Sequence, residues 1–240
     1  MQGAQLEDPR VLRTESWGVV DYETALARQL DLVAERQQRR RGDTLVAVEH
    51  PPTITLGRNA PASDVLAPTA RFAAAGGCEP SDRPRVCRSD RGGGATYHGP
   101  GQSVVYPIVD IAARRIGVRA WVSLLEDTVR AVLTGASIAS EIRPGQPGLW
   151  TEGGKIAALG LRVTRGVSYH GVAINVSLDP TVFDCIVPCG VRGQPITTMA
   201  ATLETPPAVS EVSARFISRL SEALREFSRP WPEQSATPKN

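Results

Sequence analysis

The chain has 240 residues, a formal net charge of +2 at pH 7, 41% hydrophobic residues and 22% charged residues. These values are typical of a globular protein and exclude a disordered, collagen-like or coiled-coil chain. Because the net charge is close to zero, they also argue against nucleic acid as a partner, which requires clustered basic residues.

The N-terminal residues and the cysteines indicate the compartment. Residues 1–13 include acidic side chains and lack the apolar stretch of a secretory signal. No segment approaches the roughly 20 apolar residues of a membrane span, so no membrane partner is expected. We therefore predict a cytoplasmic protein with reduced thiols at Cys78, Cys87, Cys185 and Cys189, whose spacing does not fit a zinc site.

The first predicted element is a helix that begins at Asp21. Aspartate is a good helix cap, and Leu26, Leu30 and Val33 recur behind it at helical spacing. The arginine run within 36–41 is expected to lie at the solvated C-terminal end of this helix, where the helix dipole favours cations.

Short strands follow this helix. Apolar runs bounded by proline and glycine predict strands over 45–48, 53–56 and 104–109. Residues 59–85 are rich in alanine, proline and glycine and show no clear period. We expect them to form a long surface connection.

The second half of the chain predicts a helix and then a group of strands. Strand patterns cover 148–150, 155–163 and 172–178, which we interpret as an antiparallel meander. The helix covers 118–134, and its apolar face consists of Val118, Trp121, Val122, Leu125, Val129 and Val132.

A last helix is expected to be capped by Ser210. The tail over 229–240 is polar and contains proline, so we predict that it is disordered. Because no repeat or linker divides the chain, residues 1–228 are predicted to form one domain of α/β (α+β) character with a mixed sheet. The apolar positions of the last helix are Val212, Phe216, Leu220, Leu224 and Phe227.

The densest glycine cluster is RGGGATYHGPGQ at 91–102. It has neither the Gly-Lys-Ser/Thr ending of a phosphate-binding loop nor the glycine spacing of a dinucleotide fingerprint. It therefore predicts a loop with little side-chain bulk, in which backbone N–H groups can approach a ligand closely, flanked by Arg91 and His98.

Two further positions suggest nucleophilic chemistry. Cys189 stands between Pro188 and Gly190, where a turn would expose its side chain, and a reactive thiolate needs a nearby cation. Of the 27 lysine and arginine residues only Lys155 and Lys239 are lysines, and Lys155 opens an apolar, glycine-flanked strand. A lysine there suggests an ammonium that must be able to lose its proton, which arginine cannot do.

Two other candidates have more ordinary interpretations. Cys185 is apolar in context and is predicted to belong to the core. His170 is more often a hydrogen-bonded core residue than a catalyst, although small Gly171 and Ala173 beside it would leave room for a ligand.

Taken together, five segments closely resemble the lipoyl(octanoyl) transferases, the octanoyltransferases of lipoate biosynthesis. The resemblance implies the biotin/lipoate protein ligase catalytic-domain fold, which is a mixed β-sheet flanked by helices with a smaller antiparallel sheet. The core of this catalytic domain is expected at about 40–228. The segments are EHPPTITLGR at 49–58, RGGGATYHGPGQ at 91–102, GGKIAALG at 153–160, YHGVAIN at 169–175 and VPCG at 187–190.

The resemblance also implies a reaction. In that family an octanoyl group passes from octanoyl-acyl carrier protein to an enzyme cysteine, and then to a lysine ε-amine of a lipoyl domain. The cysteine maps onto Cys189 and its partner lysine onto Lys155. The implied acceptors are lipoyl domains of 2-oxoacid dehydrogenase E2 subunits and the glycine cleavage H protein, and neither cofactor nor metal is implied.

The family's acyl pocket maps onto three of the segments. His170 is an accessory candidate, and His98 or His170 could stabilise the oxyanion of the reaction, as could N–H groups of the turn at 189–190. The implied substrate-binding residues are Arg91, Gly92, Gly93, Gly94, Ala95, Thr96, Tyr97, His98, Ala158, Leu159, Gly160, Gly171, Val172 and Ala173.

Two alternatives stay open from the sequence. An ATP-dependent lipoate or biotin ligase of the same fold would activate its acid as an acyl-adenylate and should not require Cys189. A non-catalytic module that binds lipoyl domains or acyl carrier protein should tolerate replacement of both Lys155 and Cys189.

Overall fold

The structure, a computed structural model, describes residues 11–66, 84–188 and 190–227. Its main sheet has seven strands in the order β1-β2-β6-β10-β9-β8-β7. The β1–β2 pair is parallel and the pairs from β2 to β7 are antiparallel, so the predicted mixed sheet is confirmed. In sheet order the strands are β1 (Leu12–Val19), β2 (Asp43–Glu49), β6 (Gln102–Asp110), β10 (Val167–Asn175), β9 (Gly154–Thr164), β8 (Gln146–Thr151) and β7 (Glu141–Arg143).

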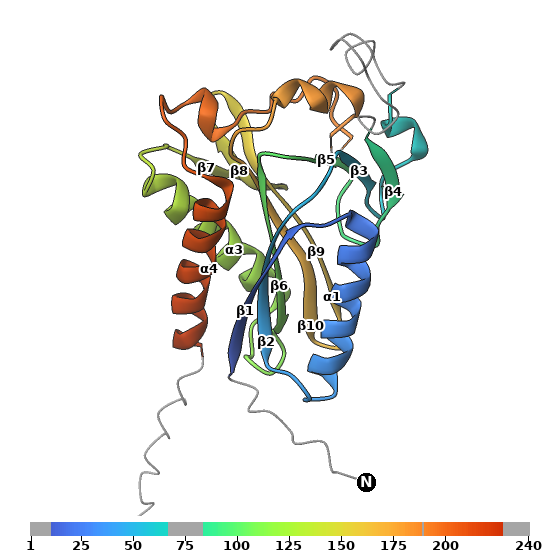
Figure 1. Cartoon of the computed structure of the whole chain (residues 1–240), viewed down its shortest axis with the longest axis vertical. Coiled ribbons are helices and arrows are strands. Elements are labelled where there is room, and N and C mark those ends of the chain that lie inside the picture. The colour runs from blue at the N-terminus through green and yellow to red at the C-terminus, as the bar shows by residue number, and fades with distance from the viewer. Residues whose placement is uncertain (1–10, 67–83, 189, 228–240) are drawn as a thin grey trace, which may run out of the picture.

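The predicted smaller sheet is also present, and it lies at one end of the main sheet (Figure 1). Its order is β4-β3-β5. The β3–β5 pair is antiparallel as expected, but the β3–β4 pair is parallel, so this sheet is mixed rather than antiparallel. Its strands are β3 (Thr53–Leu56), β4 (Arg85–Arg88) and β5 (Ala95–His98).

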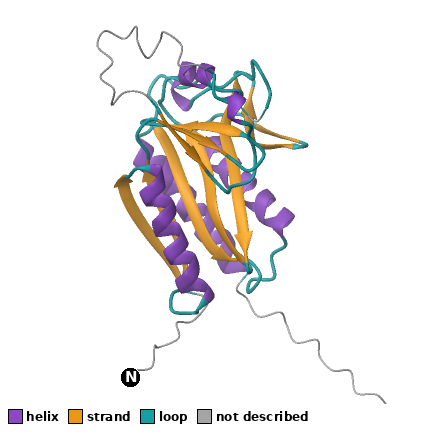
Figure 2. Ribbon diagram, turned by 90° about the vertical axis from the view of Figure 1, so that its right-hand side faces the viewer, coloured by secondary structure: helices purple, strands orange, loops and turns teal. Residues whose placement is uncertain are grey.

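Three long helices cover the two faces of the main sheet. Helix α1 (Tyr22–Gln37) lies along one face, and α3 (Val118–Thr134) and α4 (Val209–Glu226) cover the other (Figures 1 and 2). Alternation along the strands explains the two layers, because successive side chains point to opposite faces. Val104 and Tyr106 of β6 thus join the α1 cluster, whereas Val105 joins the α3/α4 cluster.

The first helix begins where it was predicted to begin, but two of its side chains differ from the prediction in their burial. The Asp21 side chain accepts a hydrogen bond from the Thr24 N–H group, which confirms the cap. Leu30, predicted to be apolar and inward, is 45% exposed. Arg36 is buried against Asp43 and Asp110, so the arginine run is not wholly solvated.

The other helices match the predicted ranges closely. Helix α3 has the predicted bounds, but Val118 is exposed because it lies in the first turn, beside a cleft described below. Helix α4 is capped by Ala208 without a side-chain bond, so the predicted cap at Ser210 is wrong, and Phe227, just beyond the helix, is 48% exposed.

Several strands are longer or more numerous than predicted. Strand β10 begins at Val167 rather than 172, and β1, β4, β5 and β7 were not predicted. The connection at 59–85 contains a short 3-10 helix at Ala62–Asp64, and its residues 67–83 lie outside the described part. The tail predicted over 229–240 also lies outside it. Within the described ranges, no helix is both long and apolar enough to cross a membrane.

Candidate active site

Lys155 lies at the start of β9 and is buried, with 6% of its surface exposed. Its N–H group donates to the Pro195 carbonyl (2.8 Å), and its carbonyl accepts from the Thr197 N–H group (3.1 Å). The segment around Ile196 therefore continues the sheet beside Lys155 as a short parallel bridge. This pairing fixes the backbone from which the ammonium extends.

The side chain of Lys155 lies against β8. Its Nζ is 5.3 Å from the centroid of the Trp150 ring, a cation–π contact, and the Arg143 guanidinium lies 4.5 Å from the same ring. Gly148 makes room for the lysine, because a Cβ there would lie 2.7 Å from Lys155 Cε and 2.3 Å from the Ala157 carbonyl oxygen. The lysine is thus held in a narrow channel between two strands.

Cys189 lies outside the described residues, but the residues on either side of it are described. Val191 N–H donates to the Pro188 carbonyl (2.9 Å), and Gly190 has a φ of 75°, a value that favours glycine. Pro188 forms a bridge with Ala95 of β5. A hydrogen bond thus joins the described residues on the two sides, while the turn predicted at Cys189 itself lies outside the described residues.

A cleft of about 620 Å³ contains Lys155 together with residues from the predicted loop and from the turn after Pro188. Gly92, Gly93 and Gly94 form part of its wall, and Gly190 and Val191 form another part. A smaller adjoining cavity brings Lys155 together with Pro188 and Ala95. Other residues of the cleft were not predicted: Asn59, Pro61, Asp64, Val118, Val122, Gly145, Gln146, Pro147, Trp150, Leu161 and Gln194.

A second, narrower pocket opens beside this cleft on the face of the sheet that α1 covers. Its floor is unusually small in side-chain volume because Ala158, Gly160, Gly171 and Ala173 meet there on neighbouring strands. The pocket contains ten of the predicted substrate-binding residues: Arg91, Gly93, Thr96, His98, Ala158, Leu159, Gly160, Gly171, Val172 and Ala173.

Two of the floor glycines stand where neighbouring groups leave no room for a side chain. A Cβ at Gly171 would lie 2.0 Å from the Val105 carbonyl oxygen, so this glycine allows β6 to approach. A Cβ at Gly160 would lie 3.0 Å from Arg91 Cδ. Gly171 lines the pocket as expected, but the space that its missing side chain would fill is taken by the Val105 carbonyl group and not by the pocket.

The glycine loop is anchored by its arginine. The buried Arg91 guanidinium donates to the Thr55 carbonyl (2.7 Å) and to Thr55 Oγ1 from both Nε and Nη2, which ties the loop to β3. Thr96 and His98 then face the narrow pocket. Tyr97, between them, packs against Phe183 in another cluster, and it lines no cavity that the described residues form around Lys155.

Three residues of the narrow pocket were not predicted from the sequence. Val104 and Tyr106 alternate on β6 and point toward α1, so the period of the strand could have identified them. Tyr22, at the start of α1, gave no such signal because its neighbours in the pocket lie far away in the chain.

His98 is a neutral hydrogen-bond acceptor toward the pocket. Gln102 Nε2 donates to the Tyr97 carbonyl and to Asn175 Oδ1, so Gln102 Oε1 is an acceptor and His98 Nδ1–H donates a hydrogen bond to it (2.8 Å). Burial, helped by the nearby imidazole of His50, lowers the pKa of His98 to about 3. In this neutral form Nδ1 of His98 is engaged and Nε2 is unprotonated.

His170 is also bonded through one ring nitrogen, in this case to a carboxylate. Its Nε2 donates to Asp90 Oδ1 (2.7 Å), and burial lowers its pKa to about 4 despite that carboxylate. Asp90 also accepts from Tyr169 and Arg162. In each histidine one ring nitrogen is thus engaged within the protein, and the oxyanion role of His98 or His170 stays a prediction.

These buried neutral histidines predict acid destabilisation. In the unfolded chain they gain protons near pH 6.5, whereas the folded chain takes them up only near pH 3 to 4. The free energy of unfolding should therefore fall as the pH falls from 6.5 toward 4, by up to about 1.4 kcal/mol per pH unit for each histidine.

Urea unfolding at a series of pH values measures this slope. His170→Asn removes one titrating group and keeps a side chain that tolerates the positive φ of 57° at this position. The variant should show a flatter dependence of unfolding free energy on pH between 6.5 and 4. An unchanged slope would contradict the assignment of His170 as a buried neutral group.

Cys185 is confirmed as a core residue. It is 3% exposed, its thiol donates to the Val182 carbonyl, and burial raises its pKa to about 11. Cys87 is also buried and free. Neither thiol has the environment of a nucleophile.

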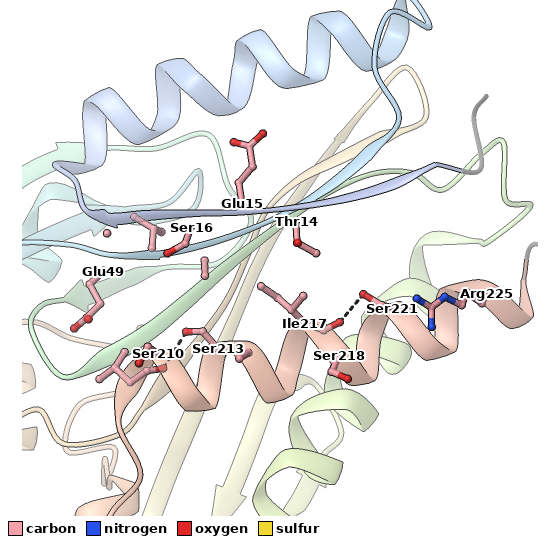
Figure 3. A pocket seen from close by; sticks show the side chains of 15 residues that line it. Thr14, Glu15, Ser16, Glu49, Ser210, Ser213, Ile217, Ser218, Ser221 and Arg225 are labelled. Carbon is pink, nitrogen blue, oxygen red and sulfur yellow. Dashed lines mark hydrogen bonds between the residues drawn. The ribbon is translucent and has the colours of Figure 1, made fainter. Parts of the chain in front are cut away.

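The largest groove elsewhere lies on the opposite face of the sheet, between β1, β2 and α4 (Figure 3). It has a volume of about 670 Å³ and contains none of the predicted site residues. The hydroxyl groups of Ser213 and Ser221 donate to carbonyls of their own helix, and Glu15 points toward α1. Two of its hydroxyl groups are therefore engaged within α4, and the described residues that line the groove include neither a cysteine nor a lysine.

Comparison with known proteins gives a family. Residues 21–221 match the lipoyl protein ligase A/B catalytic domain. The chain is 41% identical over 218 residues to an octanoyltransferase of Chloroflexus aurantiacus, with 90% of this chain and 95% of the relative covered. It is 38% identical over 222 residues to an octanoyltransferase of Saccharophagus degradans, with 91% and 96% covered.

Solved structures agree on the fold. A crystal structure of lipoate-protein ligase A bound with ATP superposes with a TM-score of 0.67 at 16% identity, covering 89% of this chain and 85% of that one. A bipartite lipoate protein ligase from Thermoplasma acidophilum gives a TM-score of 0.62 at 16% identity, with 92% and 85% covered. The chain therefore has the lipoate-protein ligase fold and belongs to the octanoyltransferases of the lipoyl protein ligase A/B catalytic-domain family, which makes it an acyltransferase.

Proposed function

We propose that this protein transfers an octanoyl group from octanoyl-acyl carrier protein to the acceptor lysine of lipoyl domains through a thioester on Cys189. The acceptors are lipoyl domains of 2-oxoacid dehydrogenase E2 subunits and the glycine cleavage H protein. The observation that carries this proposal is the buried ammonium of Lys155, which shares its cleft with Gly190 and lies beside a pocket walled by alanine and glycine.

In the first step, the Cys189 thiolate attacks the thioester carbonyl of the donor. A new carbon–sulfur bond forms, the bond to the phosphopantetheine sulfur breaks, and that sulfur leaves as a thiol after taking a proton from the Lys155 ammonium, which becomes a neutral amine. A positively charged Lys155 favours the thiolate form of Cys189 by proximity. The acyl chain occupies the narrow pocket between β9, β10 and the glycine loop.

In the second step, the acceptor lysine attacks the acyl-enzyme as a neutral amine. An amide bond forms, Cys189 leaves as a thiolate, and the proton of the attacking amine passes to a neutral Lys155. Exchange between thioesters is nearly balanced, and formation of an amide from a thioester is downhill. The reaction therefore needs no nucleotide.

Intact-mass measurement tests the proposal. Incubation with octanoyl-acyl carrier protein in the absence of ATP should add the mass of one octanoyl group, and Cys189→Ala should abolish the adduct. Cys185→Ala is the matched control: this thiol lies four residues earlier, is buried and has a raised pKa, so its loss should leave the adduct intact.

The same experiment separates the alternatives. An ATP-dependent ligase would form no adduct from the carrier protein and would become active only with ATP and free acid. A non-catalytic binding module would form no adduct under either condition. Either result would overturn the proposed transfer.

A further inference from the structure

The narrow pocket runs across the strands of the main sheet. Ala158 on β9 pairs with Ala173 on β10, and Ala173 pairs with Val104 on β6. All three line the pocket. Because Thr96 and Ala158 also line the cavity that contains Lys155, the β9 side is the entrance and the β6 side is the far end.

The length of this path matches an eight-carbon chain. Neighbouring strands lie about 4.8 Å apart, so the path from β9 to β6 is about 10 Å long. Seven carbon–carbon bonds of about 1.5 Å, in an extended zigzag, span about 9 Å. Among the described residues that line the pocket, none comes from β2, the strand beyond β6.

Aromatic rings close the far end. Tyr22, His98 and Tyr106 line the pocket there, and His50 lies behind them. The Tyr22 and His98 rings stack with centroids 5.8 Å apart, and the His50 ring lies 5.9 Å from that of Tyr106. All four side chains are buried.

Hydrogen bonds hold this wall in position. His50 Nδ1 donates to the Val20 carbonyl (2.6 Å), so His50 Nε2 is an acceptor, and the Tyr106 hydroxyl donates to it (2.7 Å). The Tyr22 hydroxyl is bonded to Ser89 Oγ (2.7 Å). A ring fixed at its hydroxyl cannot swing aside to lengthen the pocket without breaking a buried hydrogen bond.

We propose that Tyr106, positioned by His50, is the specificity-determining residue that limits the acyl chain to about eight carbons. A longer chain in the pocket would meet the Tyr106 ring, and a shorter one would leave apolar space unfilled at that end. This inference rests on the proposed function, since it concerns the chain that the Cys189 thioester would carry.

Competition between acyl donors tests the proposal. Full-length enzyme is incubated with an equimolar mixture of hexanoyl-, octanoyl-, decanoyl- and dodecanoyl-acyl carrier protein, and the acyl-enzymes are distinguished by intact mass. Tyr106→Leu should raise the ratio of dodecanoyl to octanoyl adduct about tenfold or more, because a few methylene groups in an apolar pocket discriminate by at least that factor.

Tyr106→Phe is the matched control. It removes the hydrogen bond to His50 but keeps the ring that closes the pocket, so the ratio of dodecanoyl to octanoyl adduct should rise less than in Tyr106→Leu. Ala173→Val tests the same path from its middle: added methyl groups on the floor should shift the preference from octanoyl to hexanoyl. This second variant keeps the proposal testable if Tyr106→Leu does not fold.

The outcomes distinguish the proposed limit on chain length from the proposed transfer reaction. If the unaltered enzyme forms no octanoyl adduct, the proposed function fails. If it forms the adduct but a folded Tyr106→Leu keeps the adduct ratio of the unaltered enzyme, Tyr106 does not limit the chain length. The proposed transfer then still stands. An unchanged chain-length preference in Ala173→Val would likewise contradict the proposed path of the acyl chain.

Discussion

Lys155→Arg should retain part of the acylation of Cys189 while slowing transfer to the acceptor lysine by about 10²- to 10⁴-fold, the usual contribution of a general base. Arginine keeps a positive charge in the cleft, but it does not lose its proton at any ordinary pH. The charge alone supports the thiolate, whereas the second step requires a group that can accept a proton. The two half-reactions should therefore separate in this variant.

The space around the lysine makes the substitution demanding. Gly148 and the Trp150 ring border the side chain, and the wider guanidinium must fit the same channel. A stacked guanidinium on the Trp150 face has a precedent in the same structure, since Arg143 lies 4.5 Å from that ring. A thermal unfolding curve for the variant shows whether the channel accepts the larger group.

Single-turnover measurements check the expected separation. The acyl-enzyme is formed with octanoyl-acyl carrier protein, a lipoyl domain is added, and both masses are followed in time. Lys239→Arg, at the one other lysine of the chain, should leave both steps unchanged. Full turnover in Lys155→Arg would remove Lys155 from the role of base and leave it only an electrostatic one.

The sequence predicted best those elements whose pattern is local. The predicted helix over 118–134 has the bounds of α3, because its apolar period is strong, and the strand over 53–56 has the bounds of β3. Strand β1 was missed because its mostly polar, half-exposed sequence becomes a strand through parallel pairing with β2. Strand β5 was missed because it follows directly on a glycine run.

The candidate site divides in the same way. Lys155 could be singled out from composition and its glycine-flanked strand, and ten pocket residues followed from the resemblance. The aromatic end of the pocket could not, because Tyr22, His50, His98 and Tyr106 come from four separate segments that only the folded chain brings together. The protonation of His98 likewise depends on a bond network that reaches Asn175.

Burial of charge was the least predictable feature, and the arginine run illustrates why. Arg36 ends a helix that is otherwise amphipathic, and its partner Asp43 opens the next strand. A second guanidinium, that of Arg114, reaches the same carboxylate from beyond β6. Pairing over such sequence distances leaves no periodic signal, so a solvated helix end was the natural expectation.

This buried cluster predicts the largest loss of stability from a single substitution remote from the cleft. Asp43 is fully buried; its Oδ1 accepts from Arg36 Nε (2.7 Å) and from the Asp110 N–H group (2.9 Å), and its Oδ2 accepts from Arg114 Nε (2.6 Å). Arg114 also donates to the Leu224 carbonyl. One carboxylate thus connects α1, β2, β6 and the end of α4.

Asp43→Ala should lower the free energy of unfolding by about 3–5 kcal/mol, because it leaves two guanidinium groups in the interior with their main carboxylate removed. For a chain of this size that loss corresponds to a fall in Tm of roughly 10 °C or more. Asp127→Ala removes an equally short ion pair with Arg130, but both side chains are about half exposed, so Tm should barely change. Thermal unfolding of the two variants compares the loss of a buried carboxylate with the loss of an exposed one. Small and equal shifts in Tm would show that Arg36 and Arg114 become hydrated when Asp43 is removed. That result would contradict a cluster that is closed to solvent.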